Sequence, residues 1–195
     1  MATSSTGQGE GTANEILQLK VSLVGIKPPI WRRIHVRKSD TFRQLHDYIQ
    51  QFMGWGNYHL HVFVAAGDVR IGIPEDSVGF DDIVDEGKAK ISSFLKNPKD
   101  KVKYTYDYGD NWQHVITVEK LLPSVPNVHY PVCVGGRRAC PPEDCGGVWG
   151  YVELLHIRAN PSHPEYNERI TEWLDDLYPD FDPEKFEPTD CMPFF

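Results

Sequence analysis

The stretch "KVKYTYDYGDNWQHVITVEKLL", residues 101–122, places two alternating segments on either side of a short polar turn. Apolar or aromatic residues occupy every second position up to Tyr106 and again from Trp112. This period of two is typical of strands with one buried face, so Trp112 and the tyrosines are predicted to be buried. Glycine accepts a positive φ freely and Asp and Asn favour turns. We therefore predict a β-hairpin with residues 109–111 at its tip and Gly109 in the positive-φ position.

The segments that precede this hairpin predict more strands and one helix. Residues 17–23, "LQLKVSL", alternate strictly, and "KPP" separates them from a second alternating run, "IWRRIHVRK" at 30–38, so the two are expected to pair. Residues 58–66, "YHLHVFVAA", read as another strand. Between these strands, "SDTFRQLHDYIQQFMGW" has apolar residues at helical spacing, with Ser39 or Asp40 as the N-cap and Gly54 at the stop.

The last third of the chain combines an irregular segment with helices. Residues 123–147 are rich in Pro, Gly and Cys, which predicts a long loop that is functional or disordered. Residues 74–100 give little beyond one helical turn at "ISSFL". The predicted fold class is α+β, with a mainly antiparallel sheet of hairpin-paired strands. One helix is inserted at about 40–53, and two C-terminal helices follow at about 148–158 and 164–178.

Length and charge predict one domain with a polar leader and an acidic end. The 195 residues suit a single α+β domain over 14–195, preceded by a small polar leader at 1–13 that is expected to be disordered. Ten acids and two bases between His163 and Phe195 account for the whole net charge of −8. The sequence has no run of about 18 apolar residues and no secretory signal, so we expect a cytoplasmic protein with reduced thiols and no membrane partner.

The hairpin turn carries the first group of candidate site residues. Asp107 and Asp110 flank the tip, and His114 follows on the second strand. His59 and His61 lie two residues apart in "HLH", and were the strands adjacent, imidazoles and carboxylates would converge. Such a set suits a divalent metal or acid–base chemistry. The alternative is ordinary turn chemistry beside hydrogen-bonded core histidines.

Cysteines form the second candidate site. "CVGGRRACPPEDCGG" places Cys133, Cys140 and Cys145 close together in sequence, and Cys191 or a histidine would complete four zinc ligands. The spacing lacks the paired C-x2-C motifs of a zinc ribbon, and small buried thiols in a loop are the alternative. Glu143 and Asp144 would then serve only to complement the dipole of the following helix.

A basic strand is the third candidate. Residues 27–43 contain six Lys or Arg and one Asp. One face of the strand is predicted to present Trp31, Arg33, His35 and Arg37. Guanidinium groups bind phosphates and indole rings stack on bases, so this face suits nucleic acid. A solvated outer sheet face is the alternative, because the acidic chain argues against binding over its whole surface.

Five motifs in order resemble one known family. They are "KPPIWRRI", "TFRQLHDYIQQFMGW", "HLHVF", "YTYDYGDNWQH" and "ACPPEDCGGVWGY". Over about residues 14–180 the sequence resembles the plasmid pRiA4b ORF-3-like family, also met as a passenger protein of some insertion elements. The resemblance implies one α+β domain and no settled activity. It also implies that the family's hallmark positions are His59, His61, Asp107, Asp110, His114, Cys140, Glu143, Asp144 and Cys145.

Two hypotheses of function follow. The first is a cytoplasmic binding module of the mobile-element type, without enzymatic activity, whose partner is nucleic acid or protein. The second is a metal-dependent hydrolase in which His59, His61, Asp110 and His114 hold a divalent ion such as zinc. In the second hypothesis Asp107 or Glu143 acts as the general base on a bound water. Metal content and the distances among these side chains would separate the two hypotheses.

Overall fold

Alternating sequence segments form one sheet in the computed structural model, which describes residues 15–74 and 82–188. Within these residues eight strands follow the order β5-β4-β3-β6-β7-β1-β2-β8. Their bounds are β1 Glu15–Leu23, β2 Trp31–Arg37, β3 His61–Val64, β4 Arg70–Gly72, β5 Ile83–Asp85, β6 Lys101–Tyr106, β7 Trp112–Pro123 and β8 Val132–Arg137. Neighbouring strands pair antiparallel except for β4 and β5, which are parallel. The predicted α+β class with a mainly antiparallel sheet is confirmed.

Both predicted hairpins are present. Strands β1 and β2 pair from Ile16 opposite Arg37 to Ser22 opposite Trp31, and β6 pairs with β7 around the turn at 107–111. The alternation places one set of side chains in the core, where Tyr104, Tyr106 and Trp112 are fully buried as predicted. The predicted burial of Tyr108 is wrong, because β6 ends at Tyr106 and Tyr108 lies exposed in the turn. These aromatic side chains each remove about 150–250 Å² from water, which makes them main contributors to the core.

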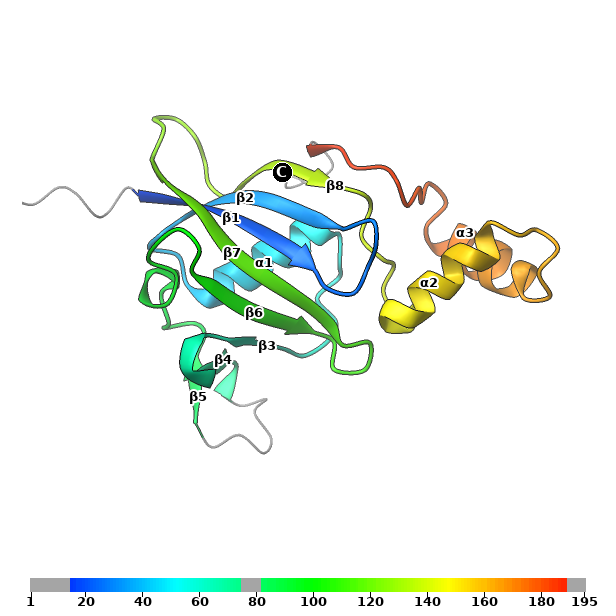
Figure 1. Ribbon diagram of the computed structural model, residues 1–195, viewed down its shortest axis with the longest axis horizontal. Helices are drawn as coiled ribbons and strands as arrows, with labels where there is room; N and C mark the ends of the chain where they lie inside the picture. Colours follow the sequence, from blue (N-terminus) through cyan, green and yellow to red (C-terminus); the bar gives the residue numbers. More distant parts are fainter. Residues whose placement is uncertain (1–14, 75–81, 189–195) are drawn as a thin grey trace, which may run out of the picture.

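Helix α1, Phe42–Met53, covers one face of the sheet, and Figure 1 shows it behind the strands. Its N-cap is Thr41 rather than Ser39 or Asp40, because the hydroxyl and the Gln44 side chain form a reciprocal capping box. The Asp40 carboxylate instead accepts the Arg37 N–H in the preceding turn. The helix ends at Gly54, which has a left-handed φ of 80°, as predicted.

The C-terminal helices stand to one side of the sheet (Figure 1). Helix α2 spans Gly147–Arg158, and a π-helical segment, Asn167–Leu174, continues into α3, Asp175–Leu177. The second predicted helix therefore begins at 167 rather than 164 and is mostly π-helical. Ile170 and Leu174 are buried as its apolar stripe requires, whereas Leu177 is exposed.

The segment 123–147 contains a strand that the sequence did not indicate. Strand β8 pairs with β2 at the sheet edge, with an irregular register between Arg33 and Ile34. "VCVGGR" lacks alternation and contains two glycines, so its pairing depends on the neighbouring strand rather than on local pattern. The predicted structureless loop is therefore wrong over 132–137. The short strands β4 and β5 were also not predicted, whereas the helical turn at "ISSFL" is a 3-10 helix at Ile91–Ser93.

The C-terminal chain folds back over the end of α1 and the β8–α2 connection. The Phe186 ring lies against the Arg32 guanidinium, and Glu184 forms an ion pair with Arg138 at 2.8 Å. The predicted disordered leader at 1–13 and Cys191 lie outside the described residues. In the part of the chain that is described, no helix has the length and apolar character needed to cross a bilayer.

Candidate functional site

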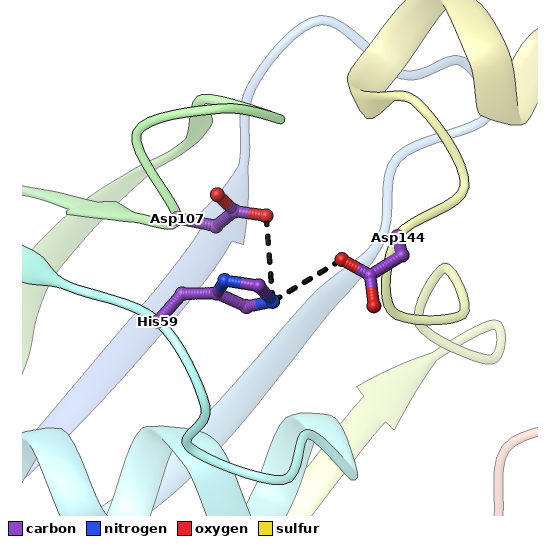
Figure 2. Close-up of side chains that lie close together, drawn as sticks. All are labelled: His59, Asp107 and Asp144. Atoms are coloured by element: carbon purple, nitrogen blue, oxygen red, sulfur yellow. Dashed lines mark ion pairs between the residues drawn. The ribbon is translucent and has the colours of Figure 1, made fainter.

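Three loops at one end of the sheet bring together His59, Asp107 and Asp144. His59 precedes β3, Asp107 follows β6, and Asp144 precedes α2. The His59 Nε2 atom lies 3.2 Å from Asp144 Oδ1 and 3.8 Å from Asp107 Oδ2. Figure 2 shows the imidazole nitrogen facing both carboxylates. One ligand atom from each residue falls within 4.8 Å of the others, which is near enough for a shared metal ion.

Glu143 is a fourth member of this cluster. Its Oε1 atom accepts hydrogen bonds from the Gly56 N–H at 2.8 Å and from the Tyr106 hydroxyl at 3.0 Å. Its Oε2 atom points to the same space as the others, 4.0 Å from His59 Nε2. Among the described residues neither Glu143 Oε2 nor His59 Nε2 has a hydrogen-bond partner, although Asp144 is an ion-pair partner of His59 Nε2. A buried carboxylate oxygen without a hydrogen bond, beside an imidazole and two more carboxylates, marks a place where a further group is expected.

The hairpin turn fixes the orientation of Asp107. Its Oδ1 atom accepts the Gly109 N–H at 2.9 Å, which leaves Oδ2 to face His59. Asp107 and Asn111 each have a φ of 55°. The prediction that Gly109 supplies the positive φ is therefore wrong, because short polar side chains that bond their own backbone also tolerate the left-handed region. Turn chemistry and a polar site coexist in this stretch.

The start of α2 holds Asp144 beside the hairpin. The Asp110 Oδ2 atom accepts the N–H of Gly146, the residue that precedes the helix, at 3.1 Å. Gly147 has a positive φ of 65°, and a Cβ atom there would lie 2.4 Å from the Asp110 carbonyl oxygen. A side chain at 147 would therefore push α2 away from the turn. Asp110 thus serves as a bridge between these elements and lies outside the cluster around His59.

His61 belongs to a separate buried network. Its Nε2 atom lies 2.7 Å from Glu86 Oε2, with both side chains almost fully buried. The ring stacks on His46 with centroids 3.5 Å apart. The His46 nitrogens contact the Tyr104 hydroxyl at 2.8 Å and the Asn57 side-chain oxygen at 2.7 Å. Burial, with the neighbouring His61 second, lowers the pKa of His46 to about 4.

His114 is placed in the core, away from the predicted metal set. It pairs across the sheet with Tyr104, and its ring contacts Trp55 and Tyr104. Burial lowers its pKa to about 4 and outweighs the opposite effect of the nearby Tyr104 and Trp112 backbone. Of the four residues predicted to hold a metal, the structure therefore brings only His59 to the cluster, and it adds Asp107, Glu143 and Asp144.

The cysteines do not gather in the described part of the chain. The Cys140 thiol lies 3.1 Å from an Arg32 nitrogen and 3.0 Å from the Met53 sulfur, and burial raises its pKa to about 11. Cys145 is buried with a pKa of about 12, again through burial. Cys133 faces the Gly135 carbonyl oxygen.

The basic strand presents the predicted side chains on the sheet face opposite α1. Arg33 makes two hydrogen bonds with the Glu119 carboxylate at 2.5 and 2.9 Å, and its guanidinium lies over the Trp31 ring. The hydrogen bond and charge of Arg33 lower the pKa of Glu119 despite the opposing effect of its burial. His35 contacts Gln18, and Arg37 donates to the Tyr130 carbonyl oxygen. This surface is separate from the cluster around His59.

Sequence reasoning missed the partners that orient the cluster. Tyr106 was expected only as a core aromatic residue, yet its hydroxyl fixes Glu143. Glu143 and Asp144 were noted at the start of a helix, and their adjacency to "CGG" was the available signal that the chain turns sharply there. His59 lies in a bend rather than in β3, so the alternation that paired it with His61 does not apply.

Comparison with known proteins identifies the family. The family described as plasmid pRiA4b ORF-3-like protein matches residues 15–190. The uncharacterized protein y4hQ of Sinorhizobium fredii is 36% identical over 159 residues, which span 81% of this chain and 80% of y4hQ. The crystal structure of MM3350, a protein of unknown function from Methanosarcina mazei Go1, is similar with a TM-score of 0.80 and 44% identity. The similarity to MM3350 covers 92% of this chain and 98% of that chain.

The chain therefore belongs to the plasmid pRiA4b ORF-3-like family, as the motifs indicated. Its relatives are described as uncharacterised or of unknown function. Their names supply no reaction, ligand or partner, so a function has to be argued from the chemistry of the site.

Proposed function

We propose that the protein is a metal-dependent hydrolase whose divalent cation is held by His59, Asp107 and Asp144. One imidazole nitrogen and several carboxylate oxygens suit zinc or manganese. Of the two hypotheses drawn from the sequence, the geometry favours the hydrolase. Its ligand set differs from the predicted one, because Asp107 and Asp144 replace His61, Asp110 and His114.

The observation that carries the proposal is the convergence of three carboxylates on His59 Nε2, at 3.2, 3.8 and 4.0 Å, with Glu143 Oε2 buried and without a hydrogen bond among the described residues. A buried polar atom without a hydrogen bond costs about 1–3 kcal/mol, so Glu143 Oε2 is expected to be satisfied by a bound species. Glu143 has little freedom to turn away, because its other oxygen is held by two donors. A cation bound to His59, with its coordinated water facing Glu143 Oε2, would satisfy both groups at once.

The distances fit a small coordination sphere. Around a tetrahedral zinc ion with bonds of about 2.0–2.1 Å, neighbouring ligand atoms stand about 3.3 Å apart. The separations of 3.2 Å and 3.8 Å from His59 Nε2 to the two aspartates lie near this value. The two aspartate oxygens lie within 4.8 Å of each other, so the carboxylates would move closer together around a bound ion.

Catalysis is favoured over a structural role by the openness of the site. The Asp144 side chain is 70% exposed, whereas those of Asp107 and Glu143 are almost buried. Three protein ligands with one solvent-facing side are characteristic of catalytic zinc, since structural sites use four ligands and are closed. Water and a small substrate would reach a bound ion from the exposed Asp144 side.

Glu143 is the residue assigned to proton transfer. A bound divalent cation would lower the pKa of a coordinated water and polarise an acyl or phosphoryl oxygen. Glu143 Oε2 accepts a proton from the attacking water while the water oxygen bonds to the substrate carbon or phosphorus. The bond to the leaving group then breaks, and the same carboxyl returns the proton to that group. Tyr106 and the Gly56 N–H hold Glu143 in place throughout.

The test measures binding and turnover separately. Calorimetric titration with Zn²⁺ and Mn²⁺ should show about one equivalent, and His59→Ala and Asp144→Asn should weaken the binding at least tenfold. Glu143→Gln should retain the ion but lose about 10²–10⁴-fold in hydrolysis of nitrophenyl esters and phosphodiesters. Asp85→Asn, an acidic residue elsewhere on the sheet, is the matched control and should change neither quantity.

Two results would overturn the proposal. Binding that survives His59→Ala and Asp144→Asn would place the metal elsewhere. An ion bound at this site without hydrolysis that depends on Glu143 would instead identify a metal-binding module without enzymatic activity.

A further inference from the structure

The face of the sheet opposite α1 is open. Figure 1 shows α1 behind the strands and no helix of the described chain across the front. Strands β1, β2, β6 and β7 direct alternate side chains to this face, and these are exposed or half-buried, whereas their neighbours lie in the core. The basic side chains among them are Lys20, Arg33, Arg37, Lys101 and Lys103.

The strand register arranges these side chains in rows. Lys101 pairs with Thr117, Thr117 with Lys20, and Lys20 with Arg33, so one row of charge crosses four strands. The next row, two residues along each strand, begins with Lys103 and ends with Trp31. Neighbouring strands lie about 4.8 Å apart and the rows about 7 Å apart, so Lys20, Lys101, Lys103 and Arg33 share two neighbouring rows.

The charge of this face contrasts with that of the whole chain. Glu119 is the acidic side chain that β1, β2, β6 and β7 direct to this face, and it pairs with Arg33. Five basic groups thus stand against one acid on a chain whose net charge is −8. A hollow of about 760 Å³ on the same face is lined in part by Arg33, Lys99 and Lys120, which extends the positive surface.

An aromatic side chain lies within this positive surface. Trp31 is half-buried, and the Lys20 ammonium and the Arg33 guanidinium each lie 4.9 Å from its ring centroid. Cations beside an indole keep phosphate-binding groups next to a stacking surface. Nucleic acid combines these two features, because each nucleotide carries one anionic phosphate and one flat base.

We propose that this face binds single-stranded nucleic acid, with phosphates held by Lys20, Lys101 and Lys103 and a base stacked on Trp31. The face presents no helix that could enter a duplex groove, so unstacked bases are the better match. The cluster around His59 lies on loops at the strand ends, so the proposal is independent of the hydrolase. If the hydrolase proposal or the nucleic-acid proposal fails its test, the other is unaffected.

The test uses fluorescence anisotropy with labelled dT20, U20 and a 20-base-pair duplex at 50 and 200 mM salt. Binding of the single strands should weaken steeply with salt. Lys101→Glu with Lys103→Glu should reduce affinity at least tenfold, and the slope of log affinity against log salt should become shallower by about 1.4, or 0.7 for each lost contact. Trp31→Ala should weaken binding at both salt concentrations without changing the slope.

The matched control is Lys90→Glu with Lys185→Glu, which changes the net charge equally at exposed positions outside the rows. The control should bind as the unchanged protein does, and all variants should keep their melting temperature. No single-strand binding at 50 mM salt, equal loss in the control, or a preference for the duplex would each overturn the proposal.

Discussion

His59 and His61 lie two residues apart in one short motif but have different surroundings. His61 is almost fully buried, pairs with Glu86 at 2.7 Å and stacks on His46. His59 is partly exposed, and its Nε2 atom has no hydrogen bond although carboxylates of Asp107, Glu143 and Asp144 surround it. The first network is complete with protein atoms alone, whereas the second leaves room for another species.

The difference teaches that a histidine motif does not identify a site until its hydrogen bonds are counted. Buried polar groups in folded proteins are almost always satisfied, so His61 has the ordinary role of a core histidine. The network around His61 also supports the other one, since His46 holds Asn57, which precedes His59 by two residues. One histidine motif thus contributes both a structural pair and a candidate ligand.

The largest expected effect is the difference in stability between alanine variants of the two histidines. His61→Ala would leave the buried Glu86 carboxylate with Arg43 as its remaining ion-pair partner, and should lower the free energy of unfolding by about 3–5 kcal/mol. His59→Ala removes only partly exposed ion pairs, so the free energy of unfolding should fall by less than about 1 kcal/mol. Urea unfolding of both variants measures the two values, and equal losses would show that the two histidines do not differ in role.

Acidification should lower the stability of the protein, because two imidazoles are buried in the neutral form. In the folded protein burial holds the pKa values of His46 and His114 at about 4, against an ordinary value of 6.5. Between pH 6.5 and 4 the unfolded chain therefore binds more protons, and stability falls as the pH falls through this window. For each histidine, the difference between these two pKa values corresponds to a loss of about 3 kcal/mol in the free energy of unfolding. The conversion is about 1.36 kcal/mol for one pKa unit.

The change that tests this contribution is His114→Phe, which keeps an aromatic ring of similar size in the core. The dependence of the unfolding free energy on pH between 6.5 and 4 should become shallower by the contribution of one proton. An unaltered slope would mean that His114 does not titrate differently in the two states.

The strong alternation of the sequence made most of the sheet predictable. The hairpins β1–β2 and β6–β7 follow from period-two patterns that only one register can bury. Strand β8 was not predictable in this way, because "VCVGGR" has no alternation and its pairing with β2 is set by tertiary contacts. The π-helical form of 167–174 also leaves no distinct mark, since its apolar spacing resembles that of an α-helix.

The sequence predicted the residue types of the candidate site, but it did not predict which of these residues come together. His59, Asp107 and Glu143 were among the candidates because polar residues of these types suit metal and acid–base chemistry. Their convergence depends on three loops and on the close approach of Gly147 to the hairpin, which are long-range features. The placement of His61 and His114 in the core follows from strand pairing, which sequence reasoning left open.

Two tyrosines offer a matched test of the separate networks. Tyr106→Phe removes the hydroxyl that holds Glu143, and Tyr104→Phe removes the hydroxyl between His46 and Gln50. Each should lower the free energy of unfolding by about 1–2 kcal/mol through lost buried hydrogen bonds. Only Tyr106→Phe should slow hydrolysis, by about tenfold, as expected for a group that orients the general base Glu143. Equal rates of hydrolysis in the two variants would show that the networks are not separate.

The smallest expected effect concerns the two aspartates of the hairpin turn. Asp110→Ala removes one partly exposed hydrogen bond to the Gly146 N–H, so the free energy of unfolding should fall by about 0.5–1 kcal/mol. The ion should still bind with the same stoichiometry, because Asp110 does not face His59. Asp107→Ala should abolish binding, since its Oδ2 atom lies in the cluster. Thermal unfolding and metal titration of both variants separate these outcomes, and loss of metal in Asp110→Ala would show that this residue is a ligand, as the sequence first predicted.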